Sequence, residues 1–253
     1  MRDEAYDLVY ILKPSHTNPD LRYSLRSVEK FCTFNKVWFI GFKPDWTTNV
    51  EFVPTEQNST KWKNSTLNVL TACKTRDISN NFILMNDDFF ALRPMHDWEH
   101  ELNLSTGTIA FMIEKHRLEK RKSVWTEGFR YAQSLLNLLD CPYSYSFEAH
   151  LPMIINRQKF IEVFEHPLLQ WFMCSEHVML KRSLYRNLTM TENTPEPRII
   201  RDVKLRQGED LSRARLDSGW LSVFDGVTGN RDQYPKLNQY LYANFKNKSR
   251  YEL

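Results

Sequence analysis

Glycine is scarce in this chain. Only 7 of its 253 residues are glycine, and no GxGxxG or Walker-type sequence occurs anywhere. Glycine-rich loops of that kind let backbone amides approach a nucleotide phosphate closely. We therefore expect any bound phosphate to be held by a metal ion, by cationic side chains or by helix N-termini.

Other common features are missing as well. The 4 cysteines lie far apart, with no C-x-x-C pair and no histidine at zinc-ligand spacing, which argues against a zinc site or a redox pair. No apolar stretch is long enough to span a bilayer and the N-terminus is charged, so we expect a cytoplasmic protein with no membrane partner. The net charge of +3 permits a polyanionic partner but does not require one.

The residues that are present indicate a folded α/β protein, since 42% are hydrophobic and 26% are charged. Over about the first 110 residues, apolar runs alternate with segments of helical spacing, which predicts a mostly parallel, doubly wound sheet. The expected strands are residues 7–12, 36–41, 49–53, 81–85 and 106–113, and the expected helices are 19–31 and 65–73.

After residue 115 the pattern becomes helical. We expect helices over residues 126–139, 156–164 and 177–185, and a peripheral helix or tail over residues 234–253. This half of the chain is expected to form a helical cap over the edge of the sheet.

The segment 81–90 (NFILMNDDFF) is the most informative stretch. An apolar run typical of a buried strand stops at Asn86, Asp87 and Asp88, and ligands of such sheets bind beyond the carboxyl ends of strands. Adjacent carboxylates repel each other and are costly to desolvate, which favours a divalent cation with oxygen ligands, Mn²⁺ or Mg²⁺, that in turn holds a diphosphate. The alternative is a turn or a helix N-cap, because Asn and Asp favour both positions.

Several segments resemble, in the same order, conserved regions of the Stealth family of sugar-phosphate transferases. That family includes the lysosomal-enzyme GlcNAc-phosphotransferase and bacterial capsule polymerases. Residues 20–30 (DLRYSLRSVEK), 43–46 (KPDW) and 82–90 (FILMNDDFF) resemble its second region, and residues 147–152 (FEAHLP) with 181–187 (KRSLYRN) resemble its third. The family's opening TWV-type motif is replaced here by DLVYILKPS, and its fourth region is not recognisable.

This compact form looks more like small glycosyltransferase-like proteins of bacteriophages, including those associated with 5-methylcytosine hydroxylases. The resemblance implies a GT-A-like fold, a nucleotide-sugar donor such as a UDP-hexose, and a Mn²⁺ or Mg²⁺ ion held by a variant DxD motif. It also implies transfer of a hexose to a hydroxyl group, with 5-hydroxymethylcytosine in phage DNA as the expected acceptor. Residues 1–115 would bind the nucleotide sugar and residues 116–253 would face the acceptor, within one globular domain.

Two other functions stay open. One is transfer of a sugar 1-phosphate to a glycan, as in the Stealth family itself. The other is a non-catalytic module that binds nucleic acid, in which the acidic motif is only structural.

Under the leading interpretation, Asp88 is expected to ligate the metal together with Asp87 and Asn86. Arg22 and Arg26 lie four residues apart on one helix face, so both guanidinium groups are candidates for binding the donor diphosphate. The alternative for these two arginines is surface ion pairing with Glu29 or Asp20.

Lys63 and Asn64 are candidates for meeting the donor phosphate at a helix N-terminus, although Asn64 would also serve as an ordinary cap. His150, held next to Pro152, is a candidate late metal ligand, base or nucleophile, and the alternative is a structural histidine of the core.

Glu148 is a candidate general base for the acceptor hydroxyl, or else a helix-capping carboxylate. Arg182 and Arg186 share a spacing of four residues and are candidates for neutralising phosphate. Asp217 and Asp225 are further catalytic candidates.

Two segments carry a basic bias that would suit a phosphate backbone, residues 114–130 and 198–215. On charge alone, a solvated helix face is the favoured explanation of such a bias. If the acceptor is DNA, Trp125 and Phe129 are candidates for stacking on a flipped base or for wedging the duplex.

Overall fold

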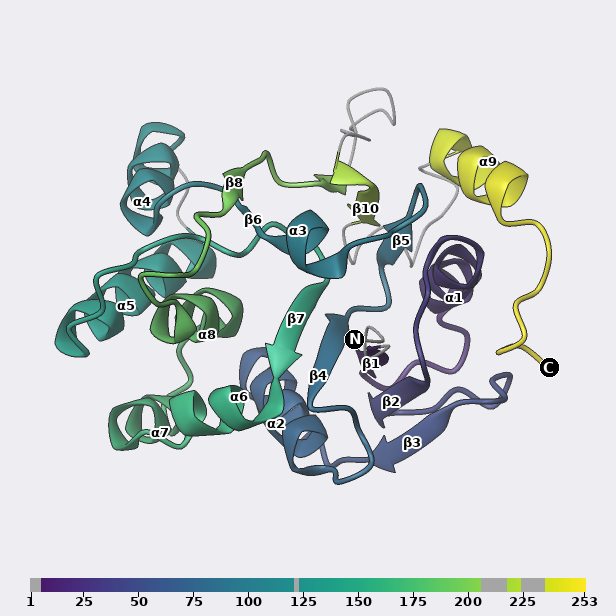
Figure 1. The fold of residues 1–253 in the computed structure, drawn as a ribbon, viewed down its shortest axis with the longest axis horizontal. Helices are drawn as coiled ribbons and strands as arrows, with labels where there is room; N and C mark the ends of the chain where they lie inside the picture. Colours follow the sequence, from purple (N-terminus) through teal and green to yellow (C-terminus); the bar gives the residue numbers. More distant parts are fainter. Residues whose placement is uncertain (1–5, 121–122, 206–217, 224–234) are drawn as a thin grey trace.

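A five-stranded sheet forms the centre of the molecule (Figure 1). The structure is a computed structural model that describes residues 6–120, 123–205, 218–223 and 235–253. The strand order is β3-β2-β1-β4-β7; the first four are parallel and β7 runs antiparallel to β4. The strands are β1 (Asp7–Ile11), β2 (Val37–Gly41), β3 (Glu51–Pro54), β4 (Asn81–Met85) and β7 (Met153–Asn156). The predicted α/β class with a mostly parallel sheet is confirmed.

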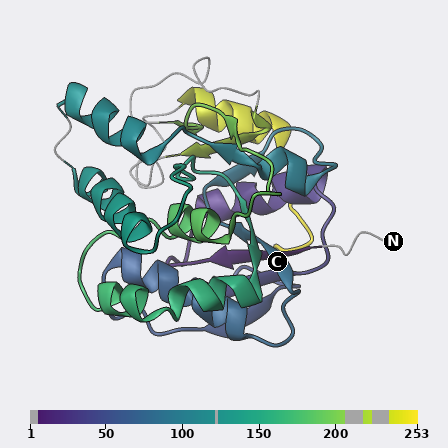
Figure 2. The ribbon, with the colours of Figure 1, turned by 60° about the vertical axis from the view of Figure 1, so that its left-hand side comes forward.

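Both faces of the strands β1, β2 and β4 are buried. Along β1, Val9 belongs to one hydrophobic cluster, and Leu8 and Tyr10 belong to another, as the alternation of side chains across a strand requires. Helix α1 (Pro19–Phe31) covers the face of Leu8, and α2 (Lys61–Lys74) covers the face of Val9 (Figure 2). Apolar residues on both faces explain why these strands are continuous hydrophobic runs.

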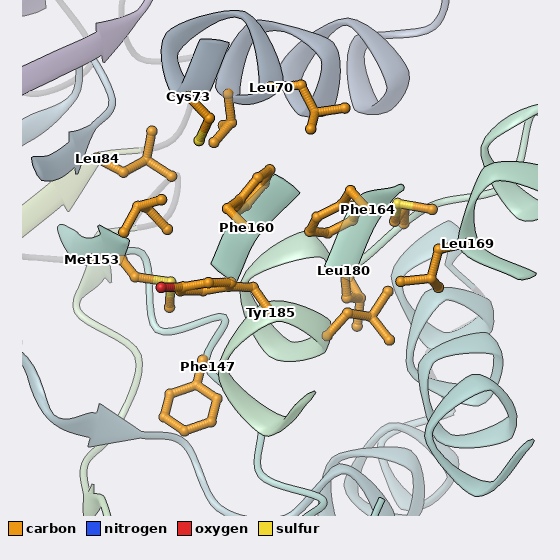
Figure 3. Close-up of a cluster of buried hydrophobic side chains, with 14 of the residues drawn as sticks. Leu70, Cys73, Leu84, Phe147, Met153, Phe160, Phe164, Leu169, Leu180 and Tyr185 are labelled. Atoms are coloured by element: carbon orange, nitrogen blue, oxygen red, sulfur yellow. The ribbon is translucent and has the colours of Figure 1, made fainter. Parts of the chain in front are cut away.

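Four helices of the carboxyl half extend the layer on the α2 side: α5 (Val124–Leu138), α6 (Arg157–Phe164), α7 (Pro167–Met173) and α8 (Lys181–Thr189). Figure 3 shows their shared core, in which Phe160 lies between Cys73 of α2 and Tyr185 of α8. The Phe160 ring stacks on Phe164 at 4.4 Å and packs against Tyr185 at 5.3 Å. The helices predicted over 126–139, 156–164 and 177–185 correspond to α5, α6 and α8, each with shifted ends.

The strand predicted over residues 106–113 is wrong. The strand β6 (Leu104–Ser105) ends before this range, and the chain then enters helix α4 (Ile109–Leu118). The Thr108 hydroxyl accepts a hydrogen bond from the Phe111 amide at 3.1 Å and caps this helix. An apolar run of this length fits either a strand or a helix, because it is too short for its period to distinguish the two structures.

The carboxyl half is not purely helical, which corrects the expectation of a helical cap. It contributes β7 to the main sheet and most of a small sheet of order β5-β10-β9. These strands are β5 (Phe89–Ala91), β9 (Lys204–Leu205) and β10 (Trp220–Val223). Helix α9 (Pro235–Asn244) packs on this sheet, with Leu237 and Leu241 in the same cluster as Phe90.

The remaining elements are short: α3 (Trp98–Leu102) and β8 (Arg198–Ile199), which pairs with β6. Nine helices lie within the described ranges. None of these nine has the length and apolar character that crossing a bilayer requires.

Candidate functional site

The carboxyl ends of β1 and β4 form the candidate site. In the strand order β2 lies on one side of β1 and β4 on the other, so the direction of winding reverses between β1 and β4. Ligands of doubly wound sheets bind outside the carboxyl ends of the strands at this switch point. Asn86, Asp87 and Asp88 follow β4 directly. The acidic motif therefore lies at the position where such a sheet binds a ligand.

Asp87 is joined to the loop that follows β1. Asn18 Nδ2 donates to Asp87 Oδ2 over 2.9 Å, and Asn18 Oδ1 accepts from the Leu21 amide over 3.2 Å. Asn18 is thus both the N-cap of α1 and a bridge to the acidic motif. Its φ of 26° lies near the left-handed region, where Asn is enriched. We did not single out Asn18 from the sequence, although an Asn followed by Pro is a helix-start signal.

Asp88 points into the molecule. It is buried, and its Oδ2 accepts a hydrogen bond of 2.7 Å from the Ser222 hydroxyl. Ser222 lies in β10 opposite Phe89, so the pairing of β5 with β10 places the hydroxyl beside the carboxylate. Sequence reasoning missed Ser222, because nothing local links a serine in the last third of the chain to the acidic motif.

Arg182 lies beside the acidic motif. Its guanidinium carbon is 5.3 Å from the ring centroid of Phe89, and its Nη1 donates to the Leu151 carbonyl. Burial lowers the pKa of Arg182, while the negative charges of Glu148 and Asp88 oppose that shift. The structure therefore brings together Arg182 and Asp88, two of the residues selected from the sequence.

Glu148 caps helix α8. Its Oε1 accepts from both the amide and the hydroxyl of Ser183, at 3.1 and 3.0 Å. The Ser183 hydroxyl in turn accepts from the Phe147 amide at 3.1 Å. Of the two interpretations drawn from the sequence, helix capping is the one that these contacts display.

Lys181 joins α8 to α2 and lies beside Arg182 and Glu148. Its Nζ donates to the Ser65 hydroxyl over 2.8 Å. Burial of the ammonium group and the adjacent charge of Arg182 lower the pKa of Lys181 to about 8, although Glu148 opposes the shift. Lysines with depressed pKa values are concentrated at functional sites. Lys181 lies in the segment KRSLYRN, but the sequence does not show that its ammonium group is buried, which is what distinguishes it from the lysines on the surface.

The direction of β7 brings a loop of the carboxyl half to the same edge. Leu84 pairs with Met153 in antiparallel register. Residues that precede Met153 therefore lie alongside residues that follow Leu84, which are those of the acidic motif. The loop 148–151 is anchored to α8 at both ends, through the contact of Glu148 with Ser183 and the contact of Leu151 with Arg182.

His150 lies in this anchored loop. Its Nδ1 is 3.0 Å from Asp202 Oδ1, and its ring packs edge-on against Trp125 at 6.2 Å. Trp125 packs in turn against Trp62 at 4.9 Å. The backbone of His150 has φ 49°, in the left-handed region that costs free energy for residues other than glycine.

The metal ligands expected from the sequence are not gathered as a set of three. Within the described ranges, no group of three His, Cys, Asp or Glu side chains could hold a metal ion. His150 contacts Asp202, and Asp88 contacts Ser222. Asp87 and Asp88 still fit a phosphate-associated Mg²⁺ or Mn²⁺ ion, because such ions take one or two carboxylates and complete their shell with waters and substrate phosphates.

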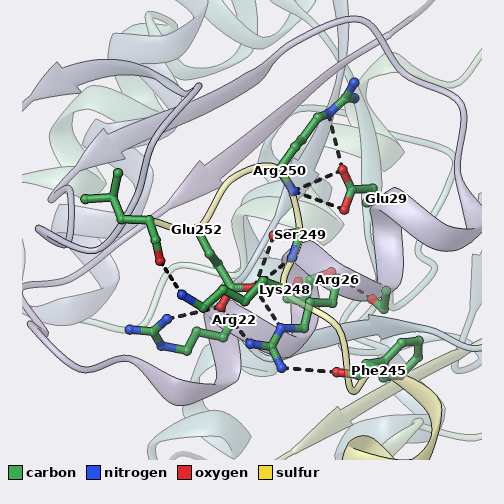
Figure 4. Close-up of polar contacts among 11 residues, drawn as sticks. Arg22, Arg26, Glu29, Phe245, Lys248, Ser249, Arg250 and Glu252 are labelled. Atoms are coloured by element: carbon green, nitrogen blue, oxygen red, sulfur yellow. Dashed lines mark hydrogen bonds and ion pairs between the residues drawn. The ribbon is translucent and has the colours of Figure 1, made fainter.

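Arg22 and Arg26 lie together, as their spacing predicts, but their partner is Glu252 (Figure 4). Arg26 Nε and Arg22 Nη1 are 2.7 and 3.0 Å from the Glu252 carboxylate. Neither of the acidic partners considered from the sequence, Glu29 or Asp20, makes this pair. The contact ties helix α1 to the segment 249–253 instead of extending into the acidic motif.

Asn64 does not cap α2. The Thr60 hydroxyl accepts from the Lys63 amide at 3.4 Å, which makes Thr60 the N-cap. The Asn64 side chain instead binds Ser59, with its Nδ2 2.8 Å from the Ser59 carbonyl.

The Asn86 carbonyl accepts a hydrogen bond from the Phe89 amide at 3.4 Å, so the acidic motif forms a turn between β4 and β5.

The two aromatic residues proposed for DNA contact differ in exposure. Phe129 is 3% exposed and packs against the ring of His116 in the core, so its proposed wedging role is wrong for the folded protein. Trp125 is half-buried and contacts Trp62 and His150.

In the basic stretch 114–130, two of the arginines form ion pairs along the helix surface, Glu114 with Arg117 and Glu127 with Arg130. These pairs are the arrangement expected for a solvated helix face.

Arg186 is anchored away from the acidic motif. Its Nη2 donates to Asn103 Oδ1 over 3.1 Å, and burial lowers the pKa of its guanidinium. Asp217, Asp225 and the end of the basic segment 198–215 lie outside the described residues.

The site as described comprises an acidic turn, a cationic pair at the start of α8, and a contact between His150 of the facing loop and Asp202 of the segment before β9. No known protein-family model matches the chain, and no curated protein sequence matches it.

Proposed function

We propose that this protein is a metal-dependent glycosyltransferase of the GT-A type, which moves a hexose from a nucleotide sugar to a hydroxyl acceptor. One observation supports this function above the others. The adjacent carboxylates Asp87 and Asp88 follow β4 at the switch point of the sheet, and the buried cation Arg182 lies beside them. Carboxylates that bind a divalent cation and cations that bind phosphate are the two requirements for holding a nucleoside diphosphate sugar.

In this proposal Asp87 and Asp88 would hold Mn²⁺ or Mg²⁺ together with the donor phosphates. The bound ion would supply electrostatic stabilisation of the departing nucleoside diphosphate. Asn18 holds the Asp87 carboxylate in place, and Ser222 does the same for Asp88. These contacts fix both side chains before the donor binds, which lowers the cost of ordering them.

The cationic pair at the start of α8 is assigned to the diphosphate. Arg182 offers a planar donor that suits phosphate oxygens, and Lys181 adds a second charge on the adjacent residue. Both side chains are held by protein contacts, Arg182 by the Leu151 carbonyl and Lys181 by Ser65. Glycine-rich loops are not required for this mode of phosphate binding.

The acceptor assigned first is 5-hydroxymethylcytosine in DNA. The resemblance to phage glycosyltransferases associated with 5-methylcytosine hydroxylases supports this choice. The half-buried Trp125, beside His150, supports it further, since an aromatic ring can stack on a base that has left the duplex.

The decisive experiment is incubation of the protein with Mn²⁺, a panel of nucleotide sugars and DNA that contains 5-hydroxymethylcytosine. Mass spectrometry of the digested nucleosides and chromatography of the released nucleotide give the products. We expect a hexose adduct and release of a nucleoside diphosphate. Asp88→Asn should lower the rate by about tenfold or more, whereas Asp77→Asn, an exposed residue before β4, should leave it unchanged.

Release of a nucleoside monophosphate would instead show transfer of a sugar phosphate. Salt-dependent DNA binding without turnover of any nucleotide sugar would contradict the proposed enzyme activity.

A further inference from the structure

The contact between His150 and Asp202 has the geometry of a histidine whose tautomer is set by a carboxylate. Asp202 Oδ1 lies 3.0 Å from His150 Nδ1. A carboxylate accepts hydrogen bonds only, so a neutral imidazole in this contact carries its proton on Nδ1. Its Nε2 is then a lone-pair acceptor, the state that a general base requires.

The small sheet connects this pair to the acidic motif. Lys204 of β9 pairs with Ser222 of β10, whose hydroxyl donates to Asp88. Asp202 lies two residues before Lys204, and its Oδ1 also accepts from the Lys204 amide at 3.1 Å. The small sheet therefore positions both Ser222, which binds Asp88, and Asp202, which binds His150.

The His150 loop reaches the same place from the other side. Residues 148–151 lie alongside the residues that follow Leu84, because β7 is antiparallel to β4. The loop is anchored to α8 through Ser183 and Arg182. Such anchoring can hold His150 at φ 49°, a conformation that costs free energy and that is concentrated at functional sites.

We infer that Asp202 is the positioning residue for His150 and that His150, through Nε2, is the base that deprotonates the acceptor hydroxyl. This inference rests on the proposed function. The acceptor O–H bond breaks and its proton moves to Nε2, while the oxygen forms a bond to the anomeric carbon. The bond from that carbon to the donor phosphate oxygen breaks, and its electron pair leaves with the nucleoside diphosphate. The reaction needs no further reactant.

The charged groups around His150 are consistent with this role. Asp202 faces the ring from the segment before β9, and Glu148 of the same loop is directed to Ser183 of α8. Arg182 of α8 contacts the loop through the Leu151 carbonyl, and the side of the ring that meets α5 is the uncharged Trp125. Glu148, the base expected from the sequence, caps a helix, so among the candidates within the described ranges His150 is the one assigned as proton acceptor.

The first test reads the histidine directly and needs no activity. Long-range ¹H–¹⁵N NMR of the free protein, at a pH where the imidazole is neutral, reports which ring nitrogen carries the proton. We expect the Nδ1–H tautomer for His150 in the wild type and a shift to Nε2–H in Asp202→Ala. An Nε2–H tautomer in the wild type would overturn the inference, whatever the outcome of the activity assay.

The second test separates chemistry from binding. Asp202→Asn should lower kcat by about 100-fold and leave KM for the nucleotide sugar within about threefold, since the residue acts on the base and not on the donor. Asp77→Asn is the matched control for exchange of a carboxylate for an amide, and thermal unfolding checks that each variant is folded. A wild-type kcat in folded Asp202→Asn would refute the inference while the glycosyltransferase assignment stands. Absence of hexose transfer by the wild type would refute the proposed function and, with it, the catalytic role of His150.

Discussion

Glu252 lies in the fork of the Arg26 guanidinium, with its two carboxylate oxygens 2.7 Å from Nε and Nη2. Arg22 Nη1 adds a third contact at 3.0 Å, and its guanidinium stacks over Trp46 at 3.8 Å. The Glu252 side chain is fully buried by these neighbours, with 0% exposed. A pairing that appeared from the sequence to be a phosphate site is therefore a structural clasp between α1 and the segment 249–253 (Figure 4).

The clasp makes stability depend on acid pH. Burial alone would raise the pKa of Glu252, but hydrogen bonds from Arg26, the Ser249 amide and Arg22 outweigh it and lower the pKa to about 2. Because the folded-state pKa lies below the ordinary value of 4.5, the contribution is complete above that pH and is lost as the pH falls towards 2. We expect Glu252→Gln to cost about 3 kcal/mol at pH 7 and to remove this part of the acid dependence in urea unfolding.

Glu29→Gln is the control for that change. Glu29 pairs with Arg250 at 3.4 Å in a partly exposed contact, so its loss should cost less than about 1 kcal/mol. An equal loss of unfolding free energy in the two variants would show that the buried Glu252 clasp stabilises the protein no more than an exposed ion pair.

Lys181 should make donor binding depend on alkaline pH. Its pKa is lowered to about 8 by burial and by Arg182, so the side chain loses its charge as the pH rises through that value. We expect the affinity for UDP with Mn²⁺, measured by calorimetry, to fall by about tenfold between pH 7 and pH 9.5.

The Lys181→Met variant should bind UDP weakly at pH 7, and its affinity should not change between pH 7 and pH 9.5. Lys36→Met, at the amino end of β2 where Lys36 pairs with Glu51, should keep the wild-type profile. A pH step that persists in Lys181→Met would assign the titration to another group.

Gly41 should not tolerate a side chain. It ends β2 with φ 108°, and a Cβ there would lie 2.4 Å from the Leu12 carbonyl oxygen and 2.6 Å from Gln57 Nε2. Gly107 has a similar φ of 113°, but a Cβ there would meet only the Phe111 ring, at 3.1 Å. We expect Gly41→Ala to destabilise by about 3 kcal/mol or more and Gly107→Ala by about 1–2 kcal/mol, measured by urea unfolding. Equal costs at the two positions would mean that the positive φ, which both glycines share, outweighs the backbone clash at Gly41.

Phe129 and Trp125 should separate folding from acceptor binding. Phe129→Ala removes a buried ring and should cost about 3–5 kcal/mol in unfolding free energy. Trp125→Ala removes a half-buried ring beside His150 and should weaken binding of single-stranded DNA by about 1–3 kcal/mol, measured by fluorescence anisotropy. Unchanged DNA affinity in folded Trp125→Ala would exclude this ring from the acceptor surface.

The centre of the fold could be predicted from sequence because its signals are local. The strands at Asp7–Ile11, Val37–Gly41 and Asn81–Met85 are buried on both faces and therefore read as unbroken apolar runs. The sequence does not predict β7, because Met153–Asn156 is only four residues long and leads directly into α6, which is too short a run for its period to show. The first five residues of α4 are consecutive apolar residues, and such a run predicts a strand as readily as a helix.

The candidate site was predictable only in part. Asp87 and Asp88 follow a recognisable strand, so their place at the sheet edge could be anticipated. Ser222 and Asp202 reach the site through the small sheet, whose strand β9 has only two residues. No periodicity exists in so short a strand, and its pairing is fixed by tertiary packing, not by propensity.

The reversed direction of β7 has a consequence for how this protein can vary. The groups around Asp87 are reached by leaving a strand, whereas His150 is reached on the way into one. The pairing of Asn81 with Asn156 holds β7 in register, and the contacts with α8 hold residues 148–151. A change in length between His150 and Met153 would therefore displace the imidazole from the acidic motif, so this wall of the site cannot vary independently of the sheet.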